Sequence, residues 1–378
     1  MDKFSFLEIT ACIGIFVILF LAVFLLTVKT KHKVGNRLFA FFLIANAIDA
    51  SKFLIHNIPE NLLNLEAFRW SIVYLVPASF YLYAMSVCYS NFRLKPKHLL
   101  HAIPFLVYNL YLMSGIYFGN TAMKLEFIKG MNQMPINHFF QFLFELLFQV
   151  YFIASFLVIK KSRTVYLENY TNPNISVISA LYKITIVYYL LHFLVLLRWL
   201  VTSTIGFGEV RAWIVTLDGF SFLFCTCWYL LTALNNPEFF RGVNSHLKPI
   251  TEVVPKQKYS PSIDDEKNKQ IESLKDFMIS NEPYLDSSLT IQDLAEQVKI
   301  PVKDLSALIN LYMNKHFFDF INEYRIEKAK EILKDPSQKD LTILEILYQV
   351  GFNSKSSFST SFKKHTGKTP TEFRKSSF

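Results

Sequence analysis

Hydrophobic positions fill the first two thirds of the chain in long runs, whereas the last third mixes apolar and polar positions with helical spacing. A helix needs about 20 apolar residues to cross the hydrocarbon of a bilayer. The pattern therefore predicts an all-α chain in which residues 1-234 form a seven-span transmembrane helix bundle. The seven stretches are Phe6 to Val28, Leu38 to Ile55, Trp70 to Tyr89, Leu99 to Phe118, Ile136 to Ile159, Leu181 to Ile205 and Ala212 to Leu234.

Composition supports this division. The chain is 52% hydrophobic and 16% aromatic, which is more apolar than an ordinary soluble protein. The first run has no small-residue cleavage site after it, so we interpret it as a span rather than a signal peptide. The second is the weakest of the seven, because Asp49 and Lys52 interrupt it. The four cysteines lie in apolar stretches without metal or disulfide spacing, and we predict no metal and no cofactor.

The loops between the runs predict the orientation of the bundle. Basic residues gather after the first, third and fifth runs, and the other loops have fewer, although Lys124 and Lys129 blur the contrast. Basic loops face the cytoplasm, so the N-terminus is expected outside the cell inner membrane. An odd number of spans then leaves everything after Leu234 in the cytoplasm. The basic residues are Lys29, Lys31, Lys33, Arg37, Arg93, Lys95, Lys97, Lys160, Lys161 and Arg163.

The polar last third divides into a linker, 235-263, and a helical domain, 264-378. Four prolines and no strong periodicity are typical of an irregular linker; they are Pro237, Pro249, Pro255 and Pro261. The next segment, from Asp264 to Asn281, has the spacing of an amphipathic helix. Its apolar face, around Ile271 to Met278, suits either a homodimer contact or packing on the rest of the domain, and we expect the packing.

Two similar units follow, at about 289-312 and 341-365. In the first, Thr290 is placed to cap a short helix, a turn passes through Lys299, and Leu305 faces inward on a second helix. In the second, Gly351 supplies the turn and Ser354 begins a helix with Phe358 and Phe362 inward. One long helix, about Phe317 to Leu333, joins the units. A short helix, a tight turn and a second helix form the geometry that places a recognition helix in the major groove of DNA.

The segment Leu289 to Arg374 resembles the DNA-binding domain of the AraC-type (AraC/XylS) transcription regulators. The resemblance rests on Arg325-Ile326-Glu327-Lys328-Ala329, on Gly351-Phe352-Asn353-Ser354-Lys355-Ser356-Ser357-Phe358, and on Phe362 to Pro370 with Phe373-Arg374. It covers roughly the last quarter of the chain. The layout of seven spans ahead of this domain is similar to that of bacterial membrane-bound regulators of the AraC type.

The resemblance implies that each second helix enters a major groove of double-stranded DNA, about one turn, ~34 Å, apart. It implies base-facing roles for Lys303 and Ala307 in the first unit and for Lys355, Ser356 and Thr360 in the second. It also implies phosphate contacts by Asn353, Lys363, Lys364, Lys368 and Thr369. Arg325 is expected to organise the joint between the units rather than to touch a base.

The first unit departs from the family pattern. It has Lys299 where the family has a turn glycine and Pro301 where the family has a capping serine. Asp304 is a poor neighbour for phosphate, and Ala307 offers only an apolar contact. Leu347 replaces a small alanine in the second unit, so the packing there must shift. We expect the second unit to carry most of the sequence readout.

Charged and polar groups inside predicted spans are costly and therefore informative. Six of them fall in the outer half of the membrane under the derived topology: Asp49, Lys52, Glu145, His192, Arg198 and Asp218. Internal ion pairs that hold the bundle together would explain any single one of them. Their common side favours a polar cavity that binds a small ligand from the extracellular or periplasmic side.

Two other classes of protein compete with a ligand-controlled regulator. A membrane enzyme or transporter would show a catalytic constellation or an inverted repeat of broken spans, and the sequence shows neither; we predict that the protein is not an enzyme. A receptor whose tail is a protein-interaction module would agree with the weakened first unit. The basic second unit, with Lys355, Lys363, Lys364 and Lys368, argues against that alternative.

Overall fold

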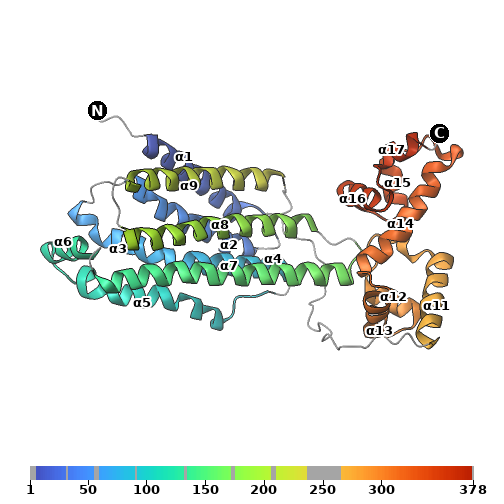
Figure 1. The fold of residues 1–378 in the computed structure, drawn as a ribbon, viewed down its shortest axis with the longest axis horizontal. Helices are drawn as coiled ribbons and strands as arrows, with labels where there is room; N and C mark the ends of the chain where they lie inside the picture. The colour runs from blue at the N-terminus through green and yellow to red at the C-terminus, as the bar shows by residue number, and fades with distance from the viewer. Residues whose placement is uncertain are drawn as a thin grey trace. The chain divides into compact units, whose positions relative to one another are not determined.

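The computed structural model describes residues 6–30, 33–54, 59–89, 92–131, 134–171, 175–205, 210–235 and 265–376. Within these ranges the chain is helical, apart from turns and one isolated antiparallel bridge between Tyr170 and Thr290. It divides into two compact units (Figure 1). The first comprises Met1–Lys161 and Ile175–Pro249, and the second comprises Ser162–Asn174 and Ile250–Phe378. The predicted linker lies almost wholly outside the described residues.

The first unit is a bundle of long apolar helices, and helix lies at each of the seven predicted stretches. Three are not a single α-helix: the second ends in a 3-10 turn, the third begins earlier than predicted and passes through a 3-10 turn, and the fourth ends in a π turn. The helices are α1 (Phe6–Thr27), α2 (Lys33–Ala50), α3 (Leu63–Ile72), α4 (Val76–Cys88), α5 (Ile103–Leu112), α6 (Thr121–Gly130), α7 (Pro135–Asn169), α8 (Ile175–Ile205) and α9 (Val210–Asn235). Helix α6 occupies a loop in which no helix was predicted.

Five segments of the described chain are long and apolar enough to cross a membrane, judged by length and composition. They are Leu7–Thr27, Glu60–Cys88, Pro96–Tyr117, Pro135–Asn169 and Val177–Leu197. The predicted count of seven is thus supported only in part. Helix α2 is not among the five, since its 18 residues include Lys33, Arg37 and Asp49. Within α9, the segment Gly219–Thr232 is a shorter apolar helix.

Aromatic side chains fill the interior of this bundle. Phe80 of α4 stacks on Phe152 of α7 with 4.9 Å between ring centroids. Phe152 in turn stacks on Tyr188 of α8 at 5.6 Å, and Phe42 of α2 meets Tyr188 at 5.3 Å. Such ring pairs contribute beyond the area that they bury, and they connect four helices from separate parts of the sequence.

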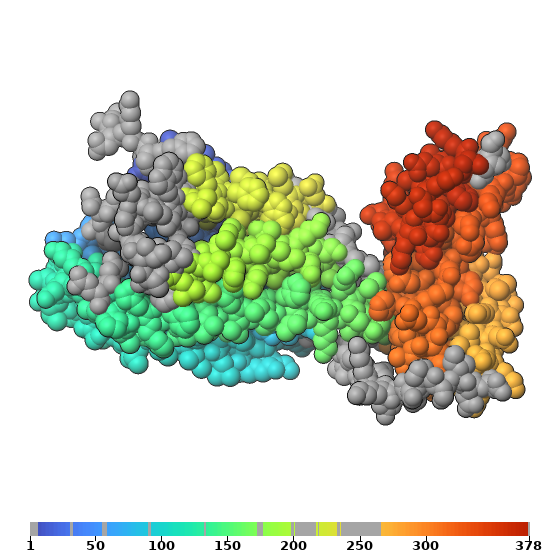
Figure 2. All heavy atoms as spheres, in the orientation of Figure 1, coloured from blue at the N-terminus to red at the C-terminus, as the bar shows by residue number. Residues whose placement is uncertain are grey.

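The outside of the bundle is also apolar. Figure 2 shows one face of it, formed by α5, α7, α8 and α9. Large apolar side chains are exposed on several helices, including Phe16 (70%), Leu110 (68%) and Phe224 (66%). Exposed apolar surface on this scale is unusual for a protein surrounded by water.

The second unit contains the end of α7 and seven further α-helices. They are α11 (Asp265–Asn281), α12 (Ile291–Val298), α13 (Val302–Ala307), α14 (Phe317–Lys334), α15 (Ile343–Gln349), α16 (Lys355–Thr366) and α17 (Pro370–Lys375). Figure 1 shows α14 running from the α12–α13 pair to the α15–α16 pair. The long joining helix predicted at about 317 to 333 is confirmed.

Helix α14 contributes to two separate hydrophobic cores. Phe317, Phe320 and Ile321 belong to the core of the first helical pair. Ile326, Ala329 and Leu333 belong to the core of the second. Helix α11 packs on the first core through Leu274 and Met278, which are buried. The expectation that this helix packs on its own domain is therefore confirmed.

Candidate nucleic-acid interface

The first helical pair forms a helix-turn-helix as predicted. Thr290 caps α12 by accepting a hydrogen bond from the Asp293 amide at 3.2 Å, and its own amide donates to the Asp293 carboxylate at 2.9 Å. The helix ends at Lys299, whose φ of 55° lies in the left-handed region. This lysine occupies the conformation for which glycine is better suited. Pro301 is the N-cap of α13, and that helix continues into a π turn at Leu308–Tyr312.

The second pair repeats this arrangement with a glycine in the turn. Thr342 caps α15, and Ser354 caps α16 by accepting from the Ser357 amide at 3.4 Å. Between them Gly351 has a φ of 85°, and a Cβ there would lie 2.5 Å from the Tyr284 carbonyl oxygen and 2.7 Å from that of Leu285. Glycine is thus required both by conformation and by close backbone packing. Phe358 is fully buried on the inner face of α16.

The outer face of α16 carries the residues for which base contacts were predicted. Lys355, Ser356 and Thr360 are exposed, and so is Asn353 just before the helix. Phe358 and Phe362 are buried, which fixes the opposite face of α16 inward. On α13, Lys303 is exposed and Ala307 is half-buried. The structure therefore leaves these side chains available, while their contacts with DNA remain predictions.

Several of the predicted phosphate-binding residues at the end of α16 and after it already have partners within the protein. Lys363 and Lys364 lie in its last turn, and Lys364 pairs with Asp319 of α14 at 2.6 Å. The Lys368 ammonium donates to the Ser376 hydroxyl at 3.1 Å. The Thr369 hydroxyl accepts from the Glu372 amide at 3.3 Å as the cap of α17. A phosphate contact by Thr369 would therefore have to share a hydroxyl that is already engaged.

Arg325 of α14 lies at the joint between the two helical pairs, as predicted. It is fully buried, and it donates to the carbonyl oxygens of Tyr284 at 2.6 Å and Asp286 at 2.7 Å. Its guanidinium lies 5.4 Å from the ring centroid of Phe352 in the second pair. Burial lowers the pKa of Arg325 to about 9, so the side chain is still a cation at neutral pH.

The end of α7 adds a contact to this joint that the sequence did not suggest. Thr171 is buried, and its hydroxyl donates to the Leu289 carbonyl at 2.9 Å. The Thr171 carbonyl oxygen accepts from Arg325 at 3.5 Å. Tyr170 forms the isolated bridge with Thr290, the residue that caps α12. We call Tyr170 and Thr171 the α7 strap. Nothing in the sequence around a polar residue such as Thr171 indicates which distant residue it will contact.

Comparison with known proteins identifies the C-terminal part of the chain. A family model described as a helix-turn-helix domain matches residues 294–376, which begin within α12 and include the rest of both helical pairs described above. The C-terminal part of the chain thus carries a helix-turn-helix domain. The match ends just after α17 and does not extend to the apolar bundle.

Similar proteins share this helix-turn-helix domain. The Msm operon regulatory protein of Streptococcus mutans is 32% identical over 89 residues, 24% of this chain and 31% of the relative. The melibiose operon regulatory protein of Escherichia coli is 33% identical over 90 residues, 24% and 29% of the two chains. The C-terminal domain of AraT, a response regulator from Geobacillus stearothermophilus, is a solved structure with 28% identity and a TM-score of 0.24, covering 32% of this chain and 88% of that one.

The chain spans about three tenths of the length of these two regulatory proteins. Such relatives carry the helix-turn-helix domain as regulators and not as enzymes, which agrees with the prediction of a non-enzymatic chain.

The polar residues predicted to form a ligand cavity in the bundle separate into two groups. Asp49 pairs with Lys52 at 2.7 Å and lies 3.6 Å from Arg69, and Arg69 also pairs with Glu66. Glu145 lies 3.4 Å from His192. The side chains of Arg198 and Asp218 are outside the described residues. Glu66 and Arg69 were missed because α3 begins before the predicted run.

Proposed function

We propose that the protein is a membrane-embedded, sequence-specific DNA-binding transcription regulator controlled by a signal received in the helical bundle. The observation that carries the proposal is the outer face of α16. There Lys355, Ser356 and Thr360 are exposed on a helix whose inner face is fixed by Phe358. Lysine and hydroxyl side chains on such a helix are suited to base edges in a major groove.

The test is DNA binding by the full-length protein in detergent. The protein first selects its site from a pool of genomic fragments, and its affinity for that site is then measured. Changing Lys355 and Thr360 together to alanine is expected to weaken binding to the selected site by about 100-fold, because each lost base contact costs roughly 1–3 kcal/mol. Both residues are exposed, so the fold should be unaffected.

Lys275 provides the matched control, since it is an exposed lysine on α11, which packs on the first core. Lys275→Ala should leave affinity within about twofold. Binding that ignores sequence, or that is equally strong in the double variant, would favour the alternative in which this domain is a protein-interaction module.

The membrane assignment rests on the apolar helices and on the exposed apolar side chains of the bundle. The derived topology, with the N-terminus outside and the helix-turn-helix domain in the cytoplasm of a bacterial cell, is part of the proposal. Helix α7 supplies a path for the signal. Its first residues belong to the bundle, and its last turns belong to the second unit. With 35 residues it is about 52 Å long.

The α7 strap is therefore proposed to bias the helix-turn-helix domain between two states. Thr171→Val removes the hydroxyl that donates to Leu289, and leaving that buried carbonyl unpaired costs about 1 kcal/mol or more. Promoter output in cells is expected to change by at least about threefold, and the apparent DNA affinity of the purified protein is expected to change with it.

Thr171→Ser keeps the hydroxyl and should behave as the parent protein. Hydrogen exchange at the amides of Thr290 to Asp293 gives an independent readout, which should quicken in the valine variant alone. Parental output together with parental exchange in Thr171→Val would refute a role for the strap in signalling.

A further inference from the structure

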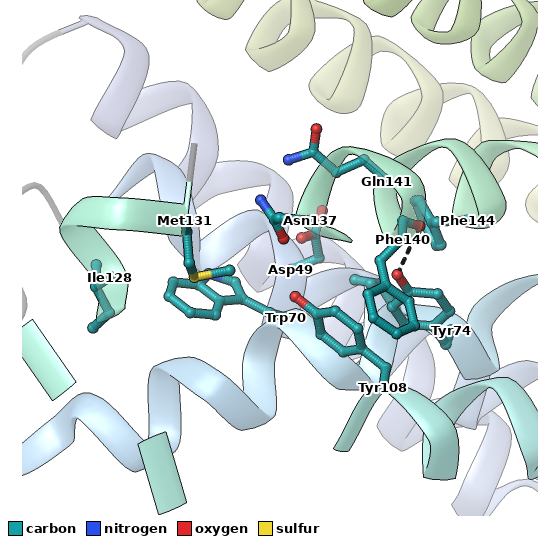
Figure 3. A pocket seen from close by; sticks show the side chains of 11 residues that line it. Asp49, Trp70, Tyr74, Tyr108, Ile128, Met131, Asn137, Phe140, Gln141 and Phe144 are labelled. Carbon is teal, nitrogen blue, oxygen red and sulfur yellow. Dashed lines mark hydrogen bonds between the residues drawn. The ribbon is translucent and has the colours of Figure 1, made fainter. Parts of the chain in front are cut away.

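Five of the eleven residues that line a cavity in the bundle are aromatic (Figure 3). The volume of the cavity is about 350 Å³, within the range of cavities that hold small ligands. Trp70 and Tyr74 come from the segment that contains α3, Tyr108 from α5, and Phe140 and Phe144 from α7. Tyr74, Tyr108 and Phe140 are buried, so these rings form walls rather than an open surface.

Polar groups enter the cavity from α2 and α7. Asp49, at the end of α2, is its one ionisable lining residue apart from the tyrosines, among the residues that the structure describes. Asn137 and Gln141 lie one turn apart on α7. Figure 3 shows the Asn137 amide on the side of the cavity where Asp49 lies. Asn137 is 3% exposed, and its side-chain amide has no hydrogen-bond partner among the described residues.

Asn137 and Gln141 belong to a polar row along an otherwise apolar helix. The row continues at the same four-residue spacing with Glu145 and Gln149, so each member neighbours the next. Asn137, Glu145 and Gln149 are buried, whereas Gln141 is exposed. Glu145 is 7% exposed, and its partner is His192. Both side-chain polar atoms of Gln149 are buried without partners within the described ranges. An unpaired buried amide is costly, so Gln149 indicates a face adapted to something besides packing.

The charges around the cavity select the class of ligand. A carboxylate lines it and a second carboxylate lies one turn beyond Gln141, whereas none of the lining residues that the structure describes is a lysine or an arginine. Aromatic faces attract cations through their negative quadrupoles. Lys52 already places an ammonium 2.7 Å from Asp49 and 5.3 Å from the ring centroid of Phe53. Lys52 and Asp49 are 43% and 33% exposed, and an exposed pair of this kind is weak enough to exchange. Arg69, which lies 3.6 Å from Asp49, would stay beside the carboxylate.

We propose that this cavity binds an organic ammonium with an aromatic or other flat apolar body. The ammonium would lie between Asp49 and the rings, taking the position beside the carboxylate that Lys52 occupies. The Asn137 amide would accept from the ligand or donate to it. This inference rests on the proposed function, for which it supplies the chemical class of the signal.

The test is calorimetric titration of the full-length protein in detergent with 2-phenylethylammonium and, as its uncharged counterpart, 2-phenylethanol. The parent protein should bind the ammonium roughly tenfold more tightly than the alcohol, because only the cation gains from the carboxylate and the ring faces. Asp49→Asn should bring the two affinities to within about twofold. Asp276→Asn, an exposed carboxylate on α11, is the matched control and should keep the parental preference.

A second variant, Trp70→Leu, serves if Asp49→Asn does not fold. It removes one ring without changing either carboxylate, and it should weaken ammonium binding by about fivefold. Equal affinity for cation and alcohol in the parent protein, or no binding above a micelle blank, would overturn the proposal. Selective DNA binding, measured on the same preparation, separates failure of the proposed ligand class from failure of the proposed function. If it persists without ammonium preference, only the ligand class is wrong; if it is absent, the proposed function fails.

Discussion

Replacing Arg325 with methionine is expected to lower the free energy of unfolding of the C-terminal domain by about 3 kcal/mol. The side chain is fully buried and donates to the carbonyl oxygens of Tyr284 and Asp286. Methionine fills much of the volume but leaves these acceptors unpaired away from water, and each unpaired buried group costs about 1–3 kcal/mol. Hydrogen exchange of α14 peptides in increasing urea, on the full-length protein in detergent, measures the loss.

The control for Arg325 is another arginine of the same domain. Arg374 in α17 has two buried guanidinium nitrogens with no hydrogen-bond partner within the described ranges. Arg374→Met therefore removes no hydrogen bond made by those nitrogens and should cost no more than about 0.5 kcal/mol. Equal effects of the two substitutions would show that the carbonyl contacts of Arg325 do not hold the joint together.

Replacing Gly351 with alanine is expected to cost at least about 3 kcal/mol. Alanine is strained at a φ of 85°, and its Cβ would lie 2.5 Å from the Tyr284 carbonyl oxygen. That neighbour is backbone, held in turn by Arg325, so it cannot turn aside as a flexible side chain would. The variant should lose ordered α15 and α16 at physiological temperature, as measured by the same exchange experiment, and with them selective DNA binding.

The same substitution at Gly367 separates the strain of a left-handed φ from the overlap of a Cβ with neighbouring backbone. Gly367 also has a left-handed φ, 75°, but a Cβ there meets no atom within 4 Å. Gly367→Ala should therefore cost only the conformational share, about 1 kcal/mol. If both alanine variants lose the same stability, the close approach of Gly351 to Tyr284 contributes nothing and the turn conformation explains the whole effect.

The sequence predicted those parts of the fold that depend on local patterns. The caps at Thr290 and Ser354, the turn at Gly351 and the helix from Phe317 each have a signal within a few residues. Lys299 shows how far such reasoning extends. It departs from the expected glycine, yet it adopts the left-handed conformation, with a φ of 55°.

Contacts between distant segments were not predictable in the same way. Thr171 and Leu289 are separated by 118 residues, and nothing in either segment identifies the other. The bundle gave a clearer missed signal. Asn137, Gln141, Glu145 and Gln149 follow a four-residue spacing on an apolar helix, but only the charged member of the row was singled out. The pairing of Asp49 with Arg69 was missed because α3 extends beyond its apolar run.

Helix α14 belongs to both cores of the C-terminal domain, and this has a consequence for the operators that the protein could use. A continuous helix of 18 residues, about 27 Å long, sets a fixed distance and rotation between the two recognition helices. A single base pair inserted between two half-sites displaces one of them by about 3.4 Å and turns it by roughly 35° around the duplex. Operators should therefore keep one spacing, and a regulator with a flexible joint would tolerate several.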